Sequence, residues 1–475
     1  MMTFLGVCLL GSAQKLKEVT IKGTAKFAAG CEIRLLAFDD LINANYRTVA
    51  KDIIDQDGRF HLSYNTNHIE LVQLAINTSK AEFFIVPSHE YVFDIEMDPQ
   101  LFQLLDPTQY GGYLQIKNSF IDTADLNYKI NRFSNFFEKV LDYYSFRLFV
   151  DLNKEVLDTV HDVMKSKFPY EYEPDNFYLS YVYYSYGSVD RIIYNKAYDS
   201  LYHVYFDNEY LLYHNPAYMN LFNSFYSNYL YNSPRISKST ITQYINDKPD
   251  FMLLFNEVGK DPLLVNEKIR ELVLIKNLGQ FYENEEFDKA NVVKLLEFVK
   301  ANSRFPEHRQ IALNTLASFD RLEKIATEKD NIVFQDAAGK NVKIQKLSGK
   351  WVYIQFFQTN CADCIREMLI MKDLHDKYKE DIDFVSISLD ADKIKLTNFV
   401  SHYPMFDWSF LHFNNQYDWL DQLGVKTLPD YLLLDPEGKI ALRYAPSPEK
   451  ELPKFLYEWF YKEEADKNPL FYPRK

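Results

Sequence analysis

Residues 356–368 of this 475-residue chain read FFQTNCADCIREM and hold two cysteines in a C-x-x-C spacing, Cys361 and Cys364. The run WVYIQFF over residues 351–357 is almost entirely apolar, which is typical of a strand in the middle of a covered sheet. Behind the cysteines, apolar residues recur at helical spacing as far as Tyr378. The pattern predicts that the cysteine pair stands where a buried strand ends and a helix begins.

This position has a chemical consequence for the cysteines. A helix N-terminus carries unpaired N–H groups and about half a positive charge, which stabilises a thiolate. The thiolate is the nucleophile in disulfide exchange, so a cysteine placed there is reactive. We therefore expect Cys361 to be the exposed nucleophile. We expect Cys364, one turn deeper, to be the resolving thiol that attacks the mixed disulfide.

The sequence from residue 330 to the end alternates strands and helices. Residues 333–342 are a predicted hairpin and residues 384–389 a second buried strand. Residues 431–434 and 439–444 are a further predicted hairpin around the turn DPEG. Such alternation is typical of an α/β layer with helices on both faces of a sheet.

The preceding part of the chain divides into two segments. Residues 14–100 contain short strand-like runs at intervals of about 8–15 residues and predict a small antiparallel β-sandwich. Residues 101–329 have helical periodicity and predict an α-helical region. Tyrosines recur every few residues between positions 170 and 231. We expect them to fill helix–helix cores, with hydroxyls reaching the surface, rather than to form a stacking surface for a ligand.

Composition limits the class of protein. The chain is 47% hydrophobic and 25% charged, which is the globular average and excludes a disordered chain. Its net charge of −14 argues against nucleic acid as the main partner, because phosphate binding needs a basic face. No run of about 18 apolar residues is present, so we expect no membrane-spanning helix in the mature chain.

The first residues predict export. Residues 1–13 hold a short apolar core followed by Gly11 and Ala13, the pattern of a secretory signal peptide that lacks its basic start and is therefore truncated. A buried first strand is the alternative. Cys8 suggests lipid attachment, but Val7 stands where a small residue is needed, so we expect none. The protein is expected in the periplasm or cell envelope.

Cysteine usage points to redox chemistry. Structural disulfides come as several widely spaced pairs in small secreted domains, whereas this long chain has one close pair. Cys31 lies alone in a strand-like stretch, where we expect a small buried apolar residue. A zinc site on the pair needs two further ligands, and His375, His402 and His412 are not at a zinc-like spacing. We expect no metal and no cofactor.

The cysteine segment resembles the active-site segment of thioredoxin-fold oxidoreductases of the TlpA type, exported relatives of thioredoxin. Downstream, residues 424–440, GVKTLPDYLLLDPEGKI, are similar to the cis-proline segment and hairpin of that family. The strand-rich N-terminal segment is similar to the small sandwich that often precedes such domains in long cell-envelope members. The resemblance implies a thioredoxin-like domain over residues 330–475 and thiol–disulfide oxidoreductase activity.

The resemblance also implies roles for individual residues. Pro429 would be cis and packed against the cysteine pair, and the backbone of Leu428 would pair with an extended substrate peptide. Glu367 matches an acid that the family places near its thiols for proton transfer. An ordinary first-turn acid, favoured by the helix dipole, is the alternative. Gln355 falls where thioredoxins proper carry a buried acid, so that relay group is absent.

Three residues depart from the family pattern. Asn360 replaces a tryptophan, Asp363 replaces the proline inside the motif, and Asp430 replaces a threonine. A carboxylate that lies about 7 Å from a thiolate destabilises it by about 1 kcal/mol when the effective dielectric constant is about 40. We therefore expect Asp363 to make the couple reducing, with a potential nearer to about −270 mV than to about −120 mV.

These observations predict an exported thiol–disulfide oxidoreductase that reduces protein disulfides. Its partners would be client proteins with disulfides or thiols, and a membrane thiol electron donor that recharges it. One alternative is a cell-envelope ligand- or protein-binding protein whose thioredoxin-like domain is mainly structural. Another is a peroxidase of the same fold, but that requires a Pro-x-x-x-Thr-x-x-Cys arrangement, which this chain lacks.

Overall fold

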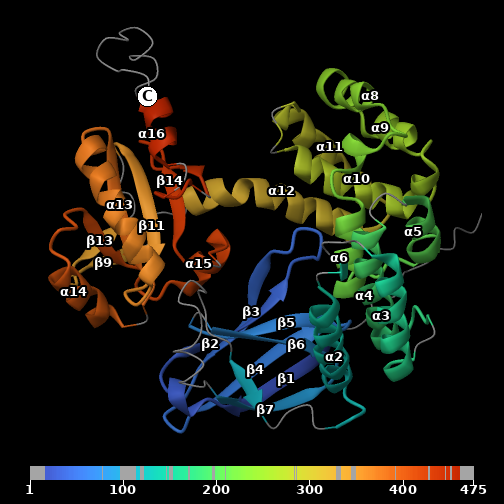
Figure 1. Cartoon of the computed structure of the whole chain (residues 1–475), viewed down its shortest axis with the longest axis horizontal. Coiled ribbons are helices and arrows are strands. Elements are labelled where there is room, and N and C mark those ends of the chain that lie inside the picture. Colours follow the sequence, from blue (N-terminus) through green and yellow to red (C-terminus); the bar gives the residue numbers. More distant parts are fainter. Residues whose placement is uncertain are drawn as a thin grey trace, which may run out of the picture.

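The three predicted parts of the chain are present in the computed structural model: an N-terminal pair of sheets, a helical middle region and a C-terminal α/β domain (Figure 1). Among the described helices, none combines the length and the apolarity that crossing a membrane requires. The expected signal peptide, residues 1–13, lies outside the described residues. The structure describes residues 16–77, 79–96, 114–117, 122–145, 147–148, 153–169, 172–194, 198–208, 210–282, 284, 286–327, 333–343, 349–390, 392–425, 428–443, 445–449 and 452–460.

The N-terminal domain is a β-sandwich. In the described part of the chain its sheets have four strands each, in the orders β4-β1-β7-β8 and β3-β2-β5-β6. Apolar residues of both sheets, such as Ile21, Leu35 and Leu74, form one buried core. The strands are β1 (Lys17–Thr24), β2 (Glu32–Phe38), β3 (Tyr46–Ile53), β4 (Arg59–Thr66), β5 (Glu70–Ile76), β6 (Ser79–Ile85), β7 (Glu90–Glu96) and β8 (Gln115–Lys117), with the helical turn η1 (Lys26–Ala28).

Three details of this domain differ from the prediction. β1 and β7 pair in parallel, so the sandwich is not wholly antiparallel. β8 pairs with β7 although it lies in the segment expected to be helical, so the sheet continues past residue 100. Both are long-range pairings, which local turn signals do not determine. Cys31 is half-buried rather than buried, because it precedes β2 at the margin of the core.

The helical middle region packs around aromatic cores. Tyr184 and Tyr226 are fully buried there, as predicted, but their hydroxyls do not reach the surface. They donate instead to the backbone carbonyls of Tyr205 and Leu263, because a buried hydroxyl needs a partner inside the protein. The elements are α2 (Leu126–Ser145), α3 (Lys154–Lys167), α4 (Phe177–Ile193), α5 (Tyr198–Tyr205), α6 (Pro216–Phe225), α7 (Tyr229–Asn232), α8 (Lys238–Thr242), η3 (Gln243–Asp247), α9 (Phe251–Val258), η4 (Pro262–Leu264), α10 (Glu267–Phe281), α11 (Lys289–Asn302) and α12 (Pro306–Thr327).

The C-terminal domain is built on a sheet whose described strands have the order β10-β9-β13-β12-β11-β14-β15. The central strand β11 (Trp351–Phe357) is buried from Val352 onward, and it pairs in parallel with β12 and antiparallel with β14. It leads directly to the cysteine pair. The other strands are β9 (Val333–Asp336), β10 (Asn341–Lys343), β12 (Ile382–Ser388), β13 (Ser409–His412), β14 (Asp430–Leu434) and β15 (Ile440–Leu442), and the helices are α13 (Ala362–Tyr378), α14 (Lys393–His402), α15 (Tyr417–Leu423) and α16 (Leu452–Phe460).

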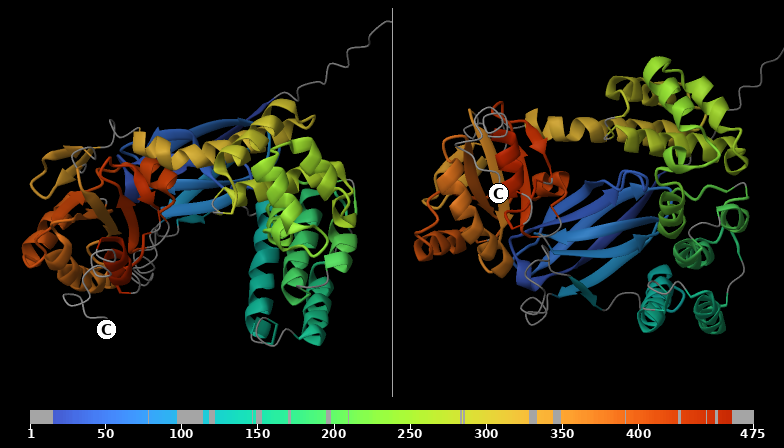
Figure 2. Two further views of the ribbon diagram at one scale, coloured as in Figure 1. Left: turned by 90° about the horizontal axis from the view of Figure 1, so that it is seen from above. Right: turned by 45° about the horizontal axis from the view of Figure 1, so that its top comes forward.

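Helix α15 is where the other two parts of the protein meet the C-terminal domain. α12 runs from the helical region to this domain and contacts α15 and β15 (Figure 1 and Figure 2). From the sandwich, Arg34 and Lys80 donate to the carboxylate of Asp421 at 2.7 and 2.8 Å. The Arg34 guanidinium also lies 5.2 Å from the ring centre of Tyr417. α15 leads into residues 424–429, so the sandwich supports the predicted substrate segment.

Replacing Asp421 with alanine is expected to weaken the C-terminal domain. The Arg34 side chain is 1% exposed, and it loses a charged hydrogen-bond acceptor while it keeps the Asn77 carbonyl at 3.0 Å and Glu32 at 4.0 Å, so we expect a loss of about 1–3 kcal/mol. Alanine favours helix, so helix propensity does not account for the loss. All four tryptophans follow residue 350, so their fluorescence during urea unfolding measures the effect in this domain.

The control for this experiment is Lys372→Met. It breaks an exposed ion pair of the C-terminal domain, Lys372–Asp376 at 2.8 Å, and is expected to change the free energy of unfolding by less than about 1 kcal/mol. Equal effects of the two substitutions would contradict the importance given to the buried contact.

Candidate redox site

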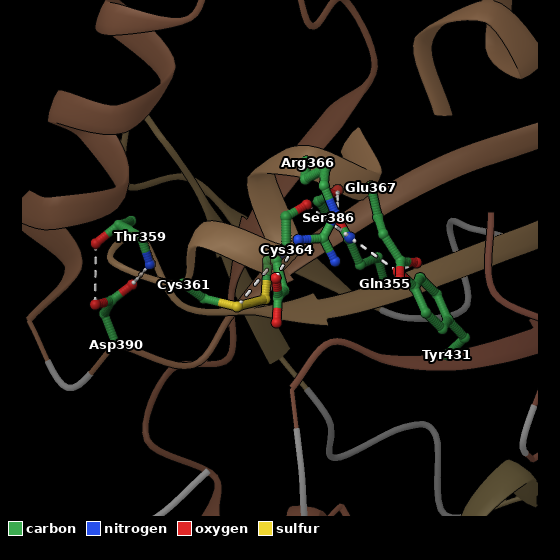
Figure 3. The surroundings of a disulfide bond; sticks show 10 residues. Gln355, Thr359, Cys361, Cys364, Arg366, Glu367, Ser386, Asp390 and Tyr431 are labelled. Atoms are coloured by element: carbon green, nitrogen blue, oxygen red, sulfur yellow. Dashed lines mark hydrogen bonds and ion pairs between the residues drawn. A yellow bond between two sulfur atoms is a disulfide. The ribbon is translucent and has the colours of Figure 1, made fainter. Parts of the chain in front are cut away.

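Cys361 and Cys364 form a disulfide where β11 ends and α13 begins, the predicted junction (Figure 3). Their Cα atoms are 5.2 Å apart. Cys361 is the N-cap residue of α13, and its Sγ accepts a hydrogen bond from the backbone N–H of Cys364 at 3.1 Å. The helix N-terminus therefore points a donor at this sulfur, which is the arrangement that stabilises a thiolate.

The prediction that Cys361 is exposed is wrong for this oxidised state. Both cysteines are 0% exposed and belong to one apolar core with Val425 and Leu428. The C-x-x-C spacing predicts the order of the two cysteines along the helix. It does not predict which other segments of the chain pack over the N-terminus of that helix. A client sulfur can contact Cys361 only after some of this packing has moved.

The Leu428–Pro429 peptide bond is cis, as the resemblance implies. Leu428 is buried and Pro429 half-buried. Arg443 of the chain just after β15 holds this segment at both ends. Its Nε donates to the carbonyl of Leu423 before the segment, and its guanidinium pairs with Asp430 after it at 2.8 and 3.0 Å.

Both acids that depart from the family pattern are paired with arginines. Asp363 accepts from Arg366 at 2.5 Å, and Asp430 is held by Arg443. The expected effect on the thiolate assumed unpaired carboxylates, whereas the two arginines offset part of their charge. The tuning role of Asp363 stays a prediction.

Glu367 differs from an ordinary first-turn acid, which faces solvent. Its residue is 7% exposed, and its carboxylate accepts a hydrogen bond from the hydroxyl of Tyr431. Burial raises the pKa of Glu367, and the bond from Tyr431 lowers it. The result is a raised pKa, which brings the carboxyl nearer to the range in which it can exchange protons at neutral pH.

Gln355 occupies the place of the buried acid of thioredoxins and is itself 0% exposed. Its Nε2 donates to the carbonyl of Cys364 and to the hydroxyl of Tyr431, each at 3.3 Å. The amide therefore ties β11 to the first turn of α13 and to β14 (Figure 3).

In the part of the chain that the structure describes, one group of side chains has the spacing of metal ligands: His375, Asp376 and Asp407. Asp376 is already paired with Lys372 at 2.8 Å. Among the described residues, no such group includes either cysteine of the pair.

Comparison with known proteins agrees with this geometry. A family model described as thioredoxin-like matches residues 349–440. The thiol-disulfide oxidoreductase ResA of Bacillus cereus (strain ATCC 10987 / NRS 248) is 32% identical over 126 residues, which are 26% of this chain and 71% of that protein. ResA of Bacillus subtilis (strain 168) is 31% identical over 127 residues, 26% of this chain and 70% of that protein. The chain belongs to this thioredoxin-like family.

As a relative of ResA, the protein is a thiol–disulfide oxidoreductase. The family model lies within the C-terminal domain and spans both the cysteine pair and the cis proline, so the chemistry belongs to that domain. A solution structure of a thiol:disulfide interchange protein from Bacteroides sp. is 20% identical, covers 29% of this chain and 91% of its own, and has a TM-score of 0.26.

The C-terminal domain contains one anchoring residue, Asp390, that was not predicted from the sequence. Asp390 is 3% exposed and accepts from the Thr359 backbone N–H at 2.9 Å and the Thr359 hydroxyl at 3.1 Å (Figure 3). It also accepts from the Ser388 hydroxyl at 2.9 Å. It holds the backbone two residues before Cys361. Its position after a buried strand was an available signal, because carboxyl ends of parallel strands meet at one edge of a sheet.

Asp390→Asn is expected to lower the free energy of unfolding by about 1–3 kcal/mol. Asparagine keeps one acceptor oxygen for the Thr359 N–H and the Ser388 hydroxyl, and its NH₂ faces the Thr359 hydroxyl, which can turn to accept. The loss arises because neutral hydrogen bonds, about half as strong, replace the charge-assisted ones. Urea unfolding followed by tryptophan fluorescence measures the change.

The matched control is Asp392→Asn, two residues further on. Asp392 caps α14 by accepting from the Ile394 N–H at 2.9 Å, and asparagine caps a helix about equally well. We expect a change within about 0.5 kcal/mol. A loss at position 392 as large as that at position 390 would contradict the anchoring role.

Proposed function

We propose that this protein is an exported reductase of protein disulfides, with Cys361 as nucleophile and Cys364 as resolving thiol. The proposal rests on the position of Cys361: it is the N-cap residue of α13, and it belongs to the same apolar core as Leu428, which precedes the cis Pro429. The relatives named thiol-disulfide oxidoreductase support the same chemistry.

The reaction would proceed in two exchanges. In the reduced enzyme the Cys361 thiolate attacks one sulfur of a client disulfide, and the other client sulfur leaves as a thiolate that takes up a proton. The Cys364 thiol then gives its proton to the Glu367 carboxylate and attacks the sulfur of Cys361. This step forms the enzyme disulfide of Figure 3 and releases the second client thiol. Two electrons pass to the client.

Binding of the client would use the segment before β14. The backbone of Leu428 is proposed to pair with an extended client peptide, as in strand addition to a sheet edge. The contacts of Arg443 with Leu423 and Asp430 support this role, because they fix residues on both sides of Leu428.

The oxidised enzyme must be reduced again before the next turnover. In an oxidising envelope we propose a membrane thiol electron donor as the partner for this step. Location in the periplasm or cell envelope rests on the signal-peptide pattern of residues 1–13.

Cys361→Ser is expected to abolish turnover in an insulin-reduction assay, because the serine hydroxyl stays protonated at neutral pH and does not attack disulfides. Cys364→Ser keeps the first attack and is expected to accumulate the mixed disulfide, visible by mass spectrometry. Insulin reduction that survives Cys361→Ser would refute the proposed mechanism.

Asp363→Asn is expected to raise the reduction potential by up to about 20 mV. Removal of the carboxylate stabilises the thiolate, hence the reduced form, and the reduced form becomes easier to reach. Equilibration of the purified protein with dithiothreitol measures the potential.

Asp373→Asn is the control for this measurement, since it removes an exposed carboxylate of the same helix about 15 Å further along its axis. It is expected to leave the potential unchanged. No upward shift in Asp363→Asn, or the same shift in Asp373→Asn, would reject the tuning role.

A second function is favoured by a cavity of about 370 Å³ between the sandwich and the helical region. Its wall includes Phe38, Arg47 and Glu70 from the sandwich and Tyr213 and Ile311 from the helical region. Cavities of this size at domain boundaries are common ligand sites. This supports a ligand-binding role in addition to the oxidoreductase activity of the C-terminal domain.

A further inference from the structure

A line of hydrogen bonds crosses the core of the C-terminal domain and ends at the carboxylate of Glu367, which follows Cys364 by three residues. Trp408 Nε1 donates to Ser386 Oγ at 2.9 Å, and Ser386 Oγ donates to Gln355 Oε1 at 3.2 Å. Gln355 Nε2 donates to the Tyr431 hydroxyl at 3.3 Å, and that hydroxyl donates to Glu367. All five residues are buried, and Figure 3 shows the last four.

The direction of every bond in this line is fixed by chemistry. The indole N–H at its start can only donate, so Ser386 Oγ accepts from it and donates onward. The side-chain amide of Gln355 could be turned either way, but its Nε2 also faces the carbonyl of Cys364, which can only accept. Gln355 therefore donates to Tyr431, and the hydroxyl hydrogen of Tyr431 is left for Glu367.

Both ends of the last bond support this direction. Burial raises the pKa of the Tyr431 hydroxyl, so it remains a donor throughout the usual pH range. Burial also raises the pKa of Glu367, and the bond from Tyr431 opposes this rise. The hydroxyl therefore favours the ionised carboxylate and fixes the position of its Oε2.

The other charged groups that act on Glu367 come from two segments. Glu449, in the chain before α16, raises its pKa. On α13 itself, Arg366 lowers its pKa and Asp363 raises it, and these two are paired with each other. Tyr431 is the neighbour that donates a hydrogen bond to the carboxylate, so it sets the orientation as well as the charge of the group.

We propose that Tyr431 is a positioning residue for Glu367. Its hydroxyl, the last donor in the line of hydrogen bonds that starts at Trp408, fixes the orientation of the carboxylate, which then accepts the proton of Cys364. The proposal rests on the proposed function, in which Glu367 takes that proton. The proton moves from Cys364 Sγ to the carboxylate, the thiolate displaces the client sulfur from Cys361, and the client thiolate takes a proton from water. Glu367 then releases its proton to solvent.

The test compares wild type, Tyr431→Phe and Glu367→Gln in the full-length protein. The infrared carboxyl band that is missing in Glu367→Gln belongs to Glu367. The intensity of this band is measured against pH, which gives the midpoint of the titration without an assay of activity. Loss of the hydroxyl removes the bond that lowers the pKa, so the midpoint is expected to move to higher pH. The acidic side of the pH profile for insulin reduction moves with it, and the rate there falls about tenfold for each pH unit by which the midpoint rises. The rate at higher pH changes little.

Tyr353→Phe is the matched control. Tyr353 is also fully buried and its ring stacks on Tyr431 at 5.3 Å, but its hydroxyl donates to the carbonyl of Pro446 at 2.7 Å. Its loss is expected to leave the midpoint of the Glu367 band unchanged. A midpoint in Tyr431→Phe equal to that of wild type, or an equal shift in Tyr353→Phe, overturns the proposal.

Two further variants distinguish a failure of this proposal from a failure of the proposed function or of folding. In a Glu367→Gln background, Tyr431→Phe is expected to cause no further change in the pH profile, and an additional shift there counts against the proposal. Should Tyr431→Phe not fold, Gln355→Met removes the donor to the hydroxyl and is expected to move the band in the same direction. Insulin reduction that does not depend on Cys361 refutes the proposed function, whereas the infrared shift still reports whether Tyr431 controls Glu367.

Discussion

The hydrogen bond from the N–H of Cys364 to the sulfur of Cys361 forms only when the surrounding C-terminal domain is folded. It requires a helix that starts at Cys361, and hence a strand that delivers the chain to that point. β11 does so as the buried central strand, with β12 beside it in parallel register. Asp390, at the end of β12, then holds the backbone of Thr359 just before the cap. The sulfur of Cys361 is thus placed by the sheet, and the start of the helix would stabilise a thiolate formed there.

The cis-proline segment, the proposed client-binding segment, is held in part by contacts outside the thioredoxin-like domain. Asp421 of α15 is held by Arg34 and Lys80 of the sandwich, and α12 of the helical region packs on the same helix. Within the domain, Arg443 joins the two ends of the cis-proline segment. Both cysteines are buried in the oxidised state, in one core with Val425 and Leu428 of this segment.

The apolar run of β11 and the helix behind Cys364 could be predicted from local periodicity. The cis bond at Pro429 was implied by the resemblance of residues 424–440 to a known family. Features that depend on distant partners could not be predicted. The burial of Cys361 depends on packing from other segments, and the bond between Glu367 and Tyr431 joins residues 64 positions apart. The parallel pairing of β1 with β7 is of the same kind.

The pKa of the Cys361 thiol in the reduced protein tests the central claim most directly. The rate of its alkylation by iodoacetamide is measured against pH, with the peptide that holds Cys361 quantified by mass spectrometry. If the start of α13 stabilises the thiolate, the midpoint lies between the value of about 7 for thioredoxin and the value of about 8.5 for free cysteine. A midpoint at or above that of free cysteine would contradict the account.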